Sequence, residues 1–334
     1  MAPLFRYPDG PVPNLLALGY AVGGYLLGMG LILAPPLALN LAGTLLLAHA
    51  MVIAAYLVHE CAHNTVFASN AHNARLGGWL NWLTGACYGD YEDIRHKHFR
   101  HHVDRADVVA FDFRTRLARH PRVLALFRAL EWAYIPAVEI MMHALVLVLP
   151  FVLPQRRARR RRVLTVLALR LVLFAALALL SWKVLLFYPL AYGLFLTVMR
   201  FMDTHQHTYE IFETLEGARG PEAKRFDAAF EQRNTYSNLV SRRHPWLNLL
   251  VLNFGYHNAH HARPTAPWYR LPALHRELYG DAAGPVLPFA NLLRAYHHYR
   301  VPRMLNADPS DLDVFRDGGV GFVGVDGVSF LTAH

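Results

Sequence analysis

The strongest constraint in this sequence is the presence of long stretches without any charged residue. Residues 14–34 and 38–58 contain no Asp, Glu, Lys or Arg. At about 1.5 Å per residue, a helix of about 20 residues crosses the roughly 30 Å hydrocarbon core of a bilayer. The two stretches are joined by Pro35 and Pro36, which interrupt helical hydrogen bonding. The sequence therefore predicts two membrane-spanning helices connected as a hairpin.

A second pair of apolar stretches follows later in the chain. Residues 163–181 and 184–201 are separated by Trp182 and Lys183, and they carry one charge in mid-span, Arg170. Over the whole chain 54% of residues are hydrophobic and 17% are charged, against about 25% charged in ordinary soluble domains. The pattern and the composition together predict an integral membrane protein with two helical hairpins.

A further apolar stretch, residues 130–153, raises a problem of parity. If it crossed the membrane as well, three crossings would separate His59 from His205 and place them on opposite sides. The arginine-rich run 156–162 belongs in the cytoplasm by the positive-inside bias. Residues 163–201 then run out and back, and residues 130–153 must enter and leave on the same side. We therefore expect this stretch to be interfacial or half-inserted.

The polar content of residues 130–153 agrees with that expectation. Glu131, Glu139 and His143 would be costly in lipid, and Pro136 and Pro150 interrupt the stretch. A fifth true span, with its polar groups buried against protein, stays open at this point.

The predicted fold is thus an all-α integral membrane protein with four spanning helices. Both termini and the large loops are expected on the cytoplasmic side, where a helical cap would hold the polar site. Residues 1–305 are expected to form this membrane domain, and residues 306–334 a C-terminal tail of unknown role. The formal charge of +9 does not indicate nucleic-acid binding, because much of the excess lies in the arginine run between apolar stretches.

Histidine is frequent, with 20 copies, and half of these gather in clusters that follow the predicted spans. The clusters are His59 with His63; His98, His101 and His102; His205 with His207; and His257, His260 and His261. The chain has only two cysteines, so it offers no Cys-x-x-Cys metal site and no disulfide framework. Any metal site must therefore be built from histidine.

The spacing within the clusters is that of metal ligands. Residues three or four apart share one face of a helix, as do His98 with His102 and His257 with His261. His96 precedes His98 by two residues and is expected to point elsewhere. Imidazole binds Fe, Zn and Cu, and eight or nine histidines exceed what one tetrahedral zinc uses, which favours two metal ions. Soluble di-iron bundles use two Glu-x-x-His motifs, and this pair is missing here, since the spacing occurs once, at Glu60 and His63.

One cluster fits a competing motif. His59-Glu60-Cys61-Ala62-His63 satisfies H-E-x-x-H, the zinc metalloprotease pattern in which Glu is the general base. An intramembrane zinc protease therefore stays an alternative. It would use two histidines and leave the other clusters without a role.

The clusters resemble the histidine boxes of the membrane fatty acid desaturase superfamily, which read H-x3/4-H, H-x2/3-HH and H-x2/3-HH plus one separate histidine. The phrase Asn253-Phe254-Gly255-Tyr256-His257-Asn258-Ala259-His260-His261 resembles the third box of sphingolipid desaturases and carotenoid ketolases. The resemblance covers roughly residues 48–279. It implies that the metal ligands are His59, His63, His98, His101, His102, His205, His257, His260 and His261, with His205 as the separate histidine and His207 outside the set.

The resemblance also implies a reaction. The expected cofactors are two non-haem iron ions with O2 as co-substrate, and the expected activity is oxidation of an unactivated C–H bond in a fatty acyl or lipid substrate. Desaturation is favoured over hydroxylation, and a carotenoid or isoprenoid oxygenase is the alternative within the superfamily. The sequence carries no His-Pro-Gly-Gly signature of a fused cytochrome b5 domain. A separate electron donor of ferredoxin, rubredoxin or cytochrome b5 type, with its reductase, is therefore expected.

Two further expectations concern the surroundings of the boxes. Metal-bound histidines usually donate their second N–H to a carboxylate or carbonyl, and the nearby candidates are Glu60, Asp90, Glu92, Asp93, Asp104, Asp107 and Asp203. An acidic donor would be attracted by a basic face, for which the candidates are Arg95, Lys97, Arg100, Arg105, Arg242, Arg243 and Arg263.

Overall fold

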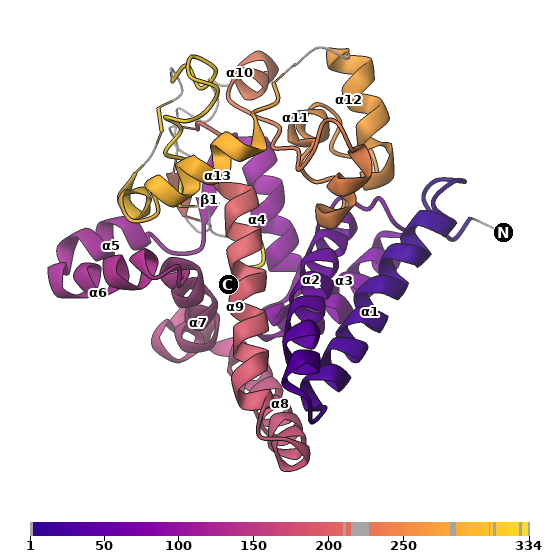
Figure 1. Ribbon diagram of the computed structural model, residues 1–334, viewed down its shortest axis with the longest axis vertical. Helices are drawn as coiled ribbons and strands as arrows, with labels where there is room; N and C mark the ends of the chain where they lie inside the picture. The colour runs from indigo at the N-terminus through magenta and orange to yellow at the C-terminus, as the bar shows by residue number, and fades with distance from the viewer. Residues whose placement is uncertain are drawn as a thin grey trace. The chain divides into compact units, whose positions relative to one another are not determined.

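The computed structural model describes residues 3–209, 212–214, 227–280, 285–306, 308–309, 312–326 and 329–332. The helices are α1 (Pro11–Leu33), α2 (Leu37–Ala62), α3 (Asn70–Thr84), α4 (Tyr91–Asp104), α5 (Phe113–Arg119), α6 (Pro121–Trp132), α7 (Ala137–Val152), α8 (Arg160–Leu180), α9 (Val184–Thr204), α10 (Ala228–Arg233), α11 (His257–Ala262), α12 (Leu271–Tyr279) and α13 (Phe289–His298). Two short strands, β1 (Asp107–Val109) and β2 (Phe212–Thr214), pair in parallel. The predicted all-α class is confirmed (Figure 1).

The chain divides into two compact units. The first unit consists of residues Met1–Ile94 and His143–Val198, and the second of Arg95–Met142 and Met199–Ala333. The first unit holds most of the long apolar helices. The second holds the second and third histidine boxes together with much of the irregular chain.

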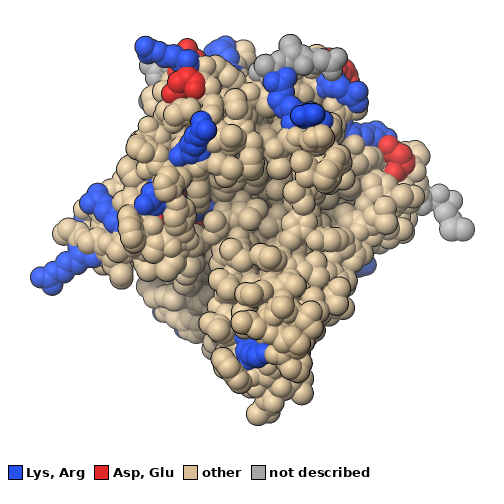
Figure 2. All heavy atoms as spheres, viewed as in Figure 1, with Lys and Arg blue, Asp and Glu red and all other residues tan. Residues whose placement is uncertain are grey.

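In the described part of the chain, four helical segments are long and apolar enough to cross a membrane, as predicted. They are Pro11–Leu33, Leu37–Ala62, Pro154–Leu180 and Val184–Thr204. Of the apolar window in Pro154–Leu180, only 11% of the residues are buried, so large side chains such as Leu171, Val172 and Leu179 face outward. An exposed apolar surface of this extent is stable in lipid and not in water. The apolar helices accordingly present a broad surface with few charged side chains (Figure 2).

The hairpin of α1 and α2 is held by close backbone packing. A Cβ atom added at Gly28 would lie 2.9 Å from the backbone nitrogen of Leu47, and one at Gly43 would lie 2.7 Å from the carbonyl oxygen of Gly28. Small residues at such positions allow membrane helices to approach closely. At the turn, the side-chain amide of Asn40 donates to the carbonyl oxygens of Leu31, Ile32 and Ala34 and so satisfies the end of α1.

The turns of the two hairpins meet within the first unit. Lys183, between α8 and α9, donates to the Asn40 side chain at 2.9 Å and to the Pro35 carbonyl oxygen beside it. Both turns therefore lie at the same end of the spanning helices. The other ends of these helices, which include Ala62 at the end of α2 and Arg160 at the start of α8, then lie together on the opposite side of the membrane. The intervening residues 63–153 begin and finish on one membrane side, as the parity argument requires.

The stretch predicted to be interfacial is broken. Helices α6 and α7 are bent by 120° at a short break, where the Glu131 carboxylate accepts hydrogen bonds from the backbone N–H groups of Ala137 and Val138. An acidic side chain at the first turn of a helix satisfies its free donors. Glu131 thus stabilises the bend that keeps this stretch from forming one straight span.

This topology gives a direct prediction. Tags or single cysteines placed at Arg116 and at Arg160 should report the same membrane side, because an even number of crossings separates them. Labelling of intact cells or sealed vesicles with an impermeant reagent measures this. Opposite labelling of the two positions would mean that residues 130–153 cross the bilayer.

Candidate metal centre

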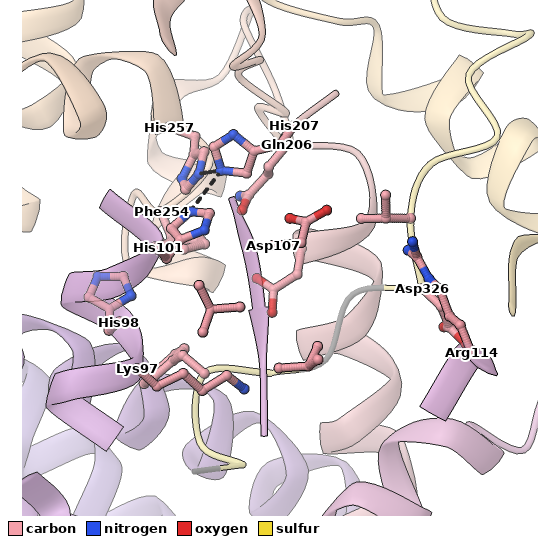
Figure 3. Close-up of a pocket in the computed structure, with 15 residues that line it drawn as sticks. Lys97, His98, His101, Asp107, Arg114, Gln206, His207, Phe254, His257 and Asp326 are labelled. Atoms are coloured by element: carbon pink, nitrogen blue, oxygen red, sulfur yellow. Dashed lines mark hydrogen bonds between the residues drawn. The ribbon is translucent and has the colours of Figure 1, made fainter. Parts of the chain in front are cut away.

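Four histidines converge in the second unit and are named the four-histidine group here. They are His101 of α4, His207 just after α9, and His257 and His261 of α11. Ring nitrogens of all four lie within 4.8 Å of one another. The Nε2 atom of His207 is 3.1 Å from that of His101 and 2.8 Å from that of His257 (Figure 3).

A second set in the same unit, the three-histidine group, lies next to the first. It consists of His98 and His102 of α4 and His260 of α11. The Nε2 atom of His102 is 3.1 Å from that of His98 and 3.2 Å from that of His260. The rings of His102 and His261, one from each group, have centroids 4.3 Å apart.

Helical spacing explains the placement of both groups. In α4, His98 and His102 are one turn apart and share a face, and His101 lies on the neighbouring face. In the six-residue helix α11, His257 and His261 are likewise one turn apart. Each helix therefore contributes ligands to both groups, which brings the groups together.

The donor set fits metal ions better than it fits hydrogen bonding. A neutral imidazole has one N–H and one acceptor nitrogen. The Nε2 of His207 faces two other Nε2 atoms, and it cannot satisfy both with one proton or one lone pair. If two nitrogen atoms each lie about 2.1 Å from a metal ion and the angle between the two bonds is a right angle, the nitrogens are about 3.0 Å apart. The observed separations of 2.8–3.2 Å match that arrangement.

Three imidazoles of the four-histidine group, those of His101, His207 and His261, are held in the neutral form that binds metal. Burial lowers the pKa of His101 to about 4, and burial lowers the pKa of His207 and His261 well below the usual range for histidine. Neighbouring imidazoles act in the same direction for His207 and His261. A proton therefore does not compete with a metal ion for these rings near neutral pH.

The Nδ1 atoms of three rings have partners that fix their orientation. His101 Nδ1 lies 2.9 Å from the Ala106 carbonyl oxygen, and His207 Nδ1 lies 3.2 Å from the Thr235 hydroxyl. His261 Nδ1 lies 2.8 Å from a carboxylate oxygen of Glu231, which also pairs with Arg105. Such partners select the tautomer that presents Nε2 to a metal.

Glu231 was not among the carboxylates considered from the sequence. It lies in α10, about 30 residues before the third box, and no histidine near it in the sequence marks its role. Several of the expected carboxylates have other partners: Asp104 pairs with Arg100, and Asp90 and Asp93 pair with Arg159.

The two histidines that follow α9 lie in different surroundings. Among the described residues, His207 belongs to the four-histidine group and His205 to neither group. The ring of His205 is fully buried among aromatic rings, 5.2 Å from the centroid of Phe322 and 6.1 Å from that of Phe201. His205 and His207 both follow the end of α9, and the path of the chain there brings the imidazole of His207 to the group.

The first box lies in the first unit. His59 is in the last turn of α2, and His63 follows its end. Both are buried, and their ring centroids are 4.7 Å apart. The spacing of four residues thus brings the two rings side by side, as predicted. His96, which was left out of the expected ligand set, is exposed.

A cavity of about 80 Å³ opens beside the four-histidine group (Figure 3). Its lining residues are Lys97, His98, His101, Asp107, Val108, Val109, Arg114, Asp203, Gln206, His207, Phe254, His257, Val325, Asp326 and Phe330. All belong to the second unit. Burial raises the pKa of Asp107 to about 7, although Arg114 acts against the shift. The cavity is therefore close to the candidate ligands, and its lining includes a buried carboxyl group.

The expected basic face is smaller than the sequence suggested. Lys97 and Arg100 are buried, with 3% and 5% of their surface exposed, and both bind groups of the second unit. Arg105 pairs with Glu231. Arg242 and Arg243 are exposed, as is Arg263, which pairs with Glu277. Of the expected residues, Arg242, Arg243 and Arg263 are thus exposed to a partner protein, and Arg95 is half-buried.

The chain was compared with models of protein families and with curated proteins. The family model described as fatty acid desaturase matches residues 35–291, which include all four histidine clusters. No curated protein matches the chain.

Proposed function

Because the chain belongs to the fatty acid desaturase family, we propose that it is a membrane-bound di-iron oxidoreductase that removes hydrogen from an unactivated C–H bond of a fatty acyl chain or lipid. The observation that carries this proposal is the convergence of two buried histidine groups in one unit. A protease would have no use for these groups. The family match also argues against a zinc protease with an H-E-x-x-H motif, because the matched region includes all four histidine clusters.

The proposed ligands follow from the two groups. His101, His207, His257 and His261 would hold one iron ion. His98, His102 and His260 would contribute to a second. His59 and His63 of the first box are proposed as further iron ligands. His207 is proposed here in the place that the sequence comparison assigned to His205, since its Nε2 faces those of His101 and His257.

When bound, iron supplies the reduction of O2 that makes an alkyl C–H bond reactive. The residues of the chain hold and protect that chemistry. Burial keeps the imidazoles neutral, Glu231 and Thr235 orient two of the rings, and the buried walls of the second unit exclude water. The metal centre and both termini are proposed to lie on the cytoplasmic side, from which reducing equivalents arrive.

The test is lipid analysis of a host with and without the gene. Desaturation lowers the mass of an acyl chain by that of two hydrogen atoms, and hydroxylation raises it by that of one oxygen atom. We expect the first outcome. Oxidation of a supplied carotenoid, with host acyl chains unchanged, would instead indicate the isoprenoid alternative.

Metal analysis of the purified protein provides an independent test. About two iron atoms per chain are expected for a histidine-rich di-metal site. Protein produced with ample iron that contains stoichiometric zinc and no iron would contradict the di-iron proposal.

The electron donor is proposed to be a separate acidic protein of the ferredoxin, rubredoxin or cytochrome b5 type. Exposed Arg242 and Arg243 offer a basic contact in the second unit. Turnover with such a donor should slow as salt rises, because the Debye length falls to about 8 Å at physiological strength. Arg242→Glu with Arg243→Glu should raise the donor concentration needed for half-maximal rate at unchanged iron content. Turnover that is indifferent to both changes would exclude steering by these arginines.

A further inference from the structure

The C-terminal part of the chain has a role in the cavity that its sequence does not reveal. Although rich in Gly and Val and without helices in its described residues beyond 306, it is buried at Phe322, Val325, Phe330 and Leu331. It packs against the end of α9, where the backbone N–H of Val325 donates to the Thr204 carbonyl oxygen at 3.2 Å. This part of the chain is therefore integrated into the second unit.

Gly324 permits this close approach. Its φ of +74° lies in the region that favours glycine, and a Cβ atom there would lie 2.5 Å from the Thr204 carbonyl oxygen. Its backbone N–H donates to the Asp308 carboxylate. A side chain at this position would push the segment away from α9.

Two buried cations hold the segment in place. Arg200 of α9 pairs with Asp326 and also with Glu131. Lys97 of α4 donates from Nζ to the carbonyl oxygen of Ser329 at 2.9 Å, and to the carbonyl and hydroxyl oxygens of Thr332 at 3.2 and 3.0 Å.

A carboxylate of α7 completes this attachment. Glu139 accepts the backbone N–H of Ser329 at 3.0 Å. Hydrogen bonds that involve a charged partner are stronger than neutral ones, and buried groups of this kind are costly to leave unpaired. Residues 329–332 are thus fixed from two sides, by Lys97 and by Glu139.

The consequence is that this segment forms part of the cavity wall. Val325, Asp326 and Phe330 line the cavity beside the histidines. The ring of Phe330 lies with its centroid 5.8 Å from that of His98, a member of the three-histidine group, and only 8% of the residue is exposed. A large apolar side chain is therefore held directly beside a candidate metal ligand by contacts made elsewhere in the segment.

We propose that Phe330 is a positioning residue for the substrate: its ring limits how far an alkyl chain enters the cavity and so sets which carbon lies beside the metal centre. This inference rests on the proposed function. Phe254, Val108 and Val109 supply other apolar lining. Phe254 also lies beside candidate ligands, with its ring centroid 5.1 Å from that of His257. Phe330 differs from it because its segment is fixed by Lys97 through Ser329 and Thr332.

The test compares Phe330→Ala, Phe330→Leu and Phe330→Trp with the parent chain. Mass-spectrometric location of the new double bond or hydroxyl in host acyl chains should show a shifted or mixed position for Phe330→Ala, a smaller shift for Phe330→Leu, and reduced turnover for Phe330→Trp. Phe315→Ala is the matched control, since Phe315 belongs to the same segment but is 46% exposed and does not line the cavity. It should leave the product position unchanged.

A second measurement does not depend on catalysis. Iron release from the purified protein to ferrozine, a water-soluble iron(II) chelator, should be several times faster for Phe330→Ala than for the parent and for Phe315→Ala. Unchanged product position and unchanged iron release in Phe330→Ala and Phe330→Leu protein that keeps its iron would overturn the proposal. If the parent itself yields no oxidised lipid, the proposed function fails, whereas the iron-release comparison still decides whether Phe330 covers the metal centre.

Discussion

Substitution of His207 by alanine is expected to remove iron from the protein and to lower activity by at least about a hundredfold. Its Nε2 lies between those of His101 and His257, at 3.1 and 2.8 Å, so its loss opens the centre of the four-histidine group. Substitution of groups that merely orient metal ligands already costs about 10- to 100-fold in affinity or activity. Iron analysis of purified protein, followed by turnover, measures the effect.

His205→Phe is the matched control for His207→Ala. His205 lies two residues away and is equally buried, and its ring packs among aromatic side chains that would accept another ring. We expect His205→Phe to retain iron. Loss of iron in His205→Phe, with retention in His207→Ala, would restore the assignment that the sequence comparison favoured.

Replacement of Arg200 by methionine is expected to destabilise the second unit by about 3–5 kcal/mol, the usual cost of removing one partner from a buried ion pair. Arg200 is 2% exposed and lies between the carboxylates of Glu131 and Asp326. Without the guanidinium, these two buried carboxylates would lose the cation that pairs with both of them. Thermal unfolding of the detergent-solubilised protein measures the change.

Two comparisons make the Arg200 prediction specific. Arg242→Met removes an exposed arginine and should change stability little, because exposed charges contribute little. Adding Glu131→Gln and Asp326→Asn to Arg200→Met should recover part of the lost stability, since the uncompensated charges are then absent. A melting temperature of Arg200→Met equal to that of Arg242→Met would show that the ion-pair network does not stabilise the fold.

Several features of this protein follow from its sequence because they depend on local pattern. A charge-free run of about 20 residues can satisfy its backbone in lipid only as a helix, so the four spans could be predicted within a few residues. Helical periodicity alone predicts that His98 and His102, or His257 and His261, point the same way. Composition and spacing therefore identified the membrane class and the histidine clusters, and the resemblance of these clusters to known histidine boxes identified the family.

Other features depend on contacts between residues that are far apart in the chain. Such contacts produce no periodic pattern in the sequence. His205 and His207 are equally plausible by spacing, and only the path of the chain after α9 brings His207 to His101 and His257. The Glu231 carboxylate reaches His261 across 30 residues. Lys97, which a count of charges assigns to the surface, is buried because the carbonyl oxygens of Ser329 and Thr332 surround its ammonium group. The tertiary structure alone places Phe330 beside His98, since hydrogen bonds and burial, unlike helical pattern, act between residues without regard to their separation in sequence.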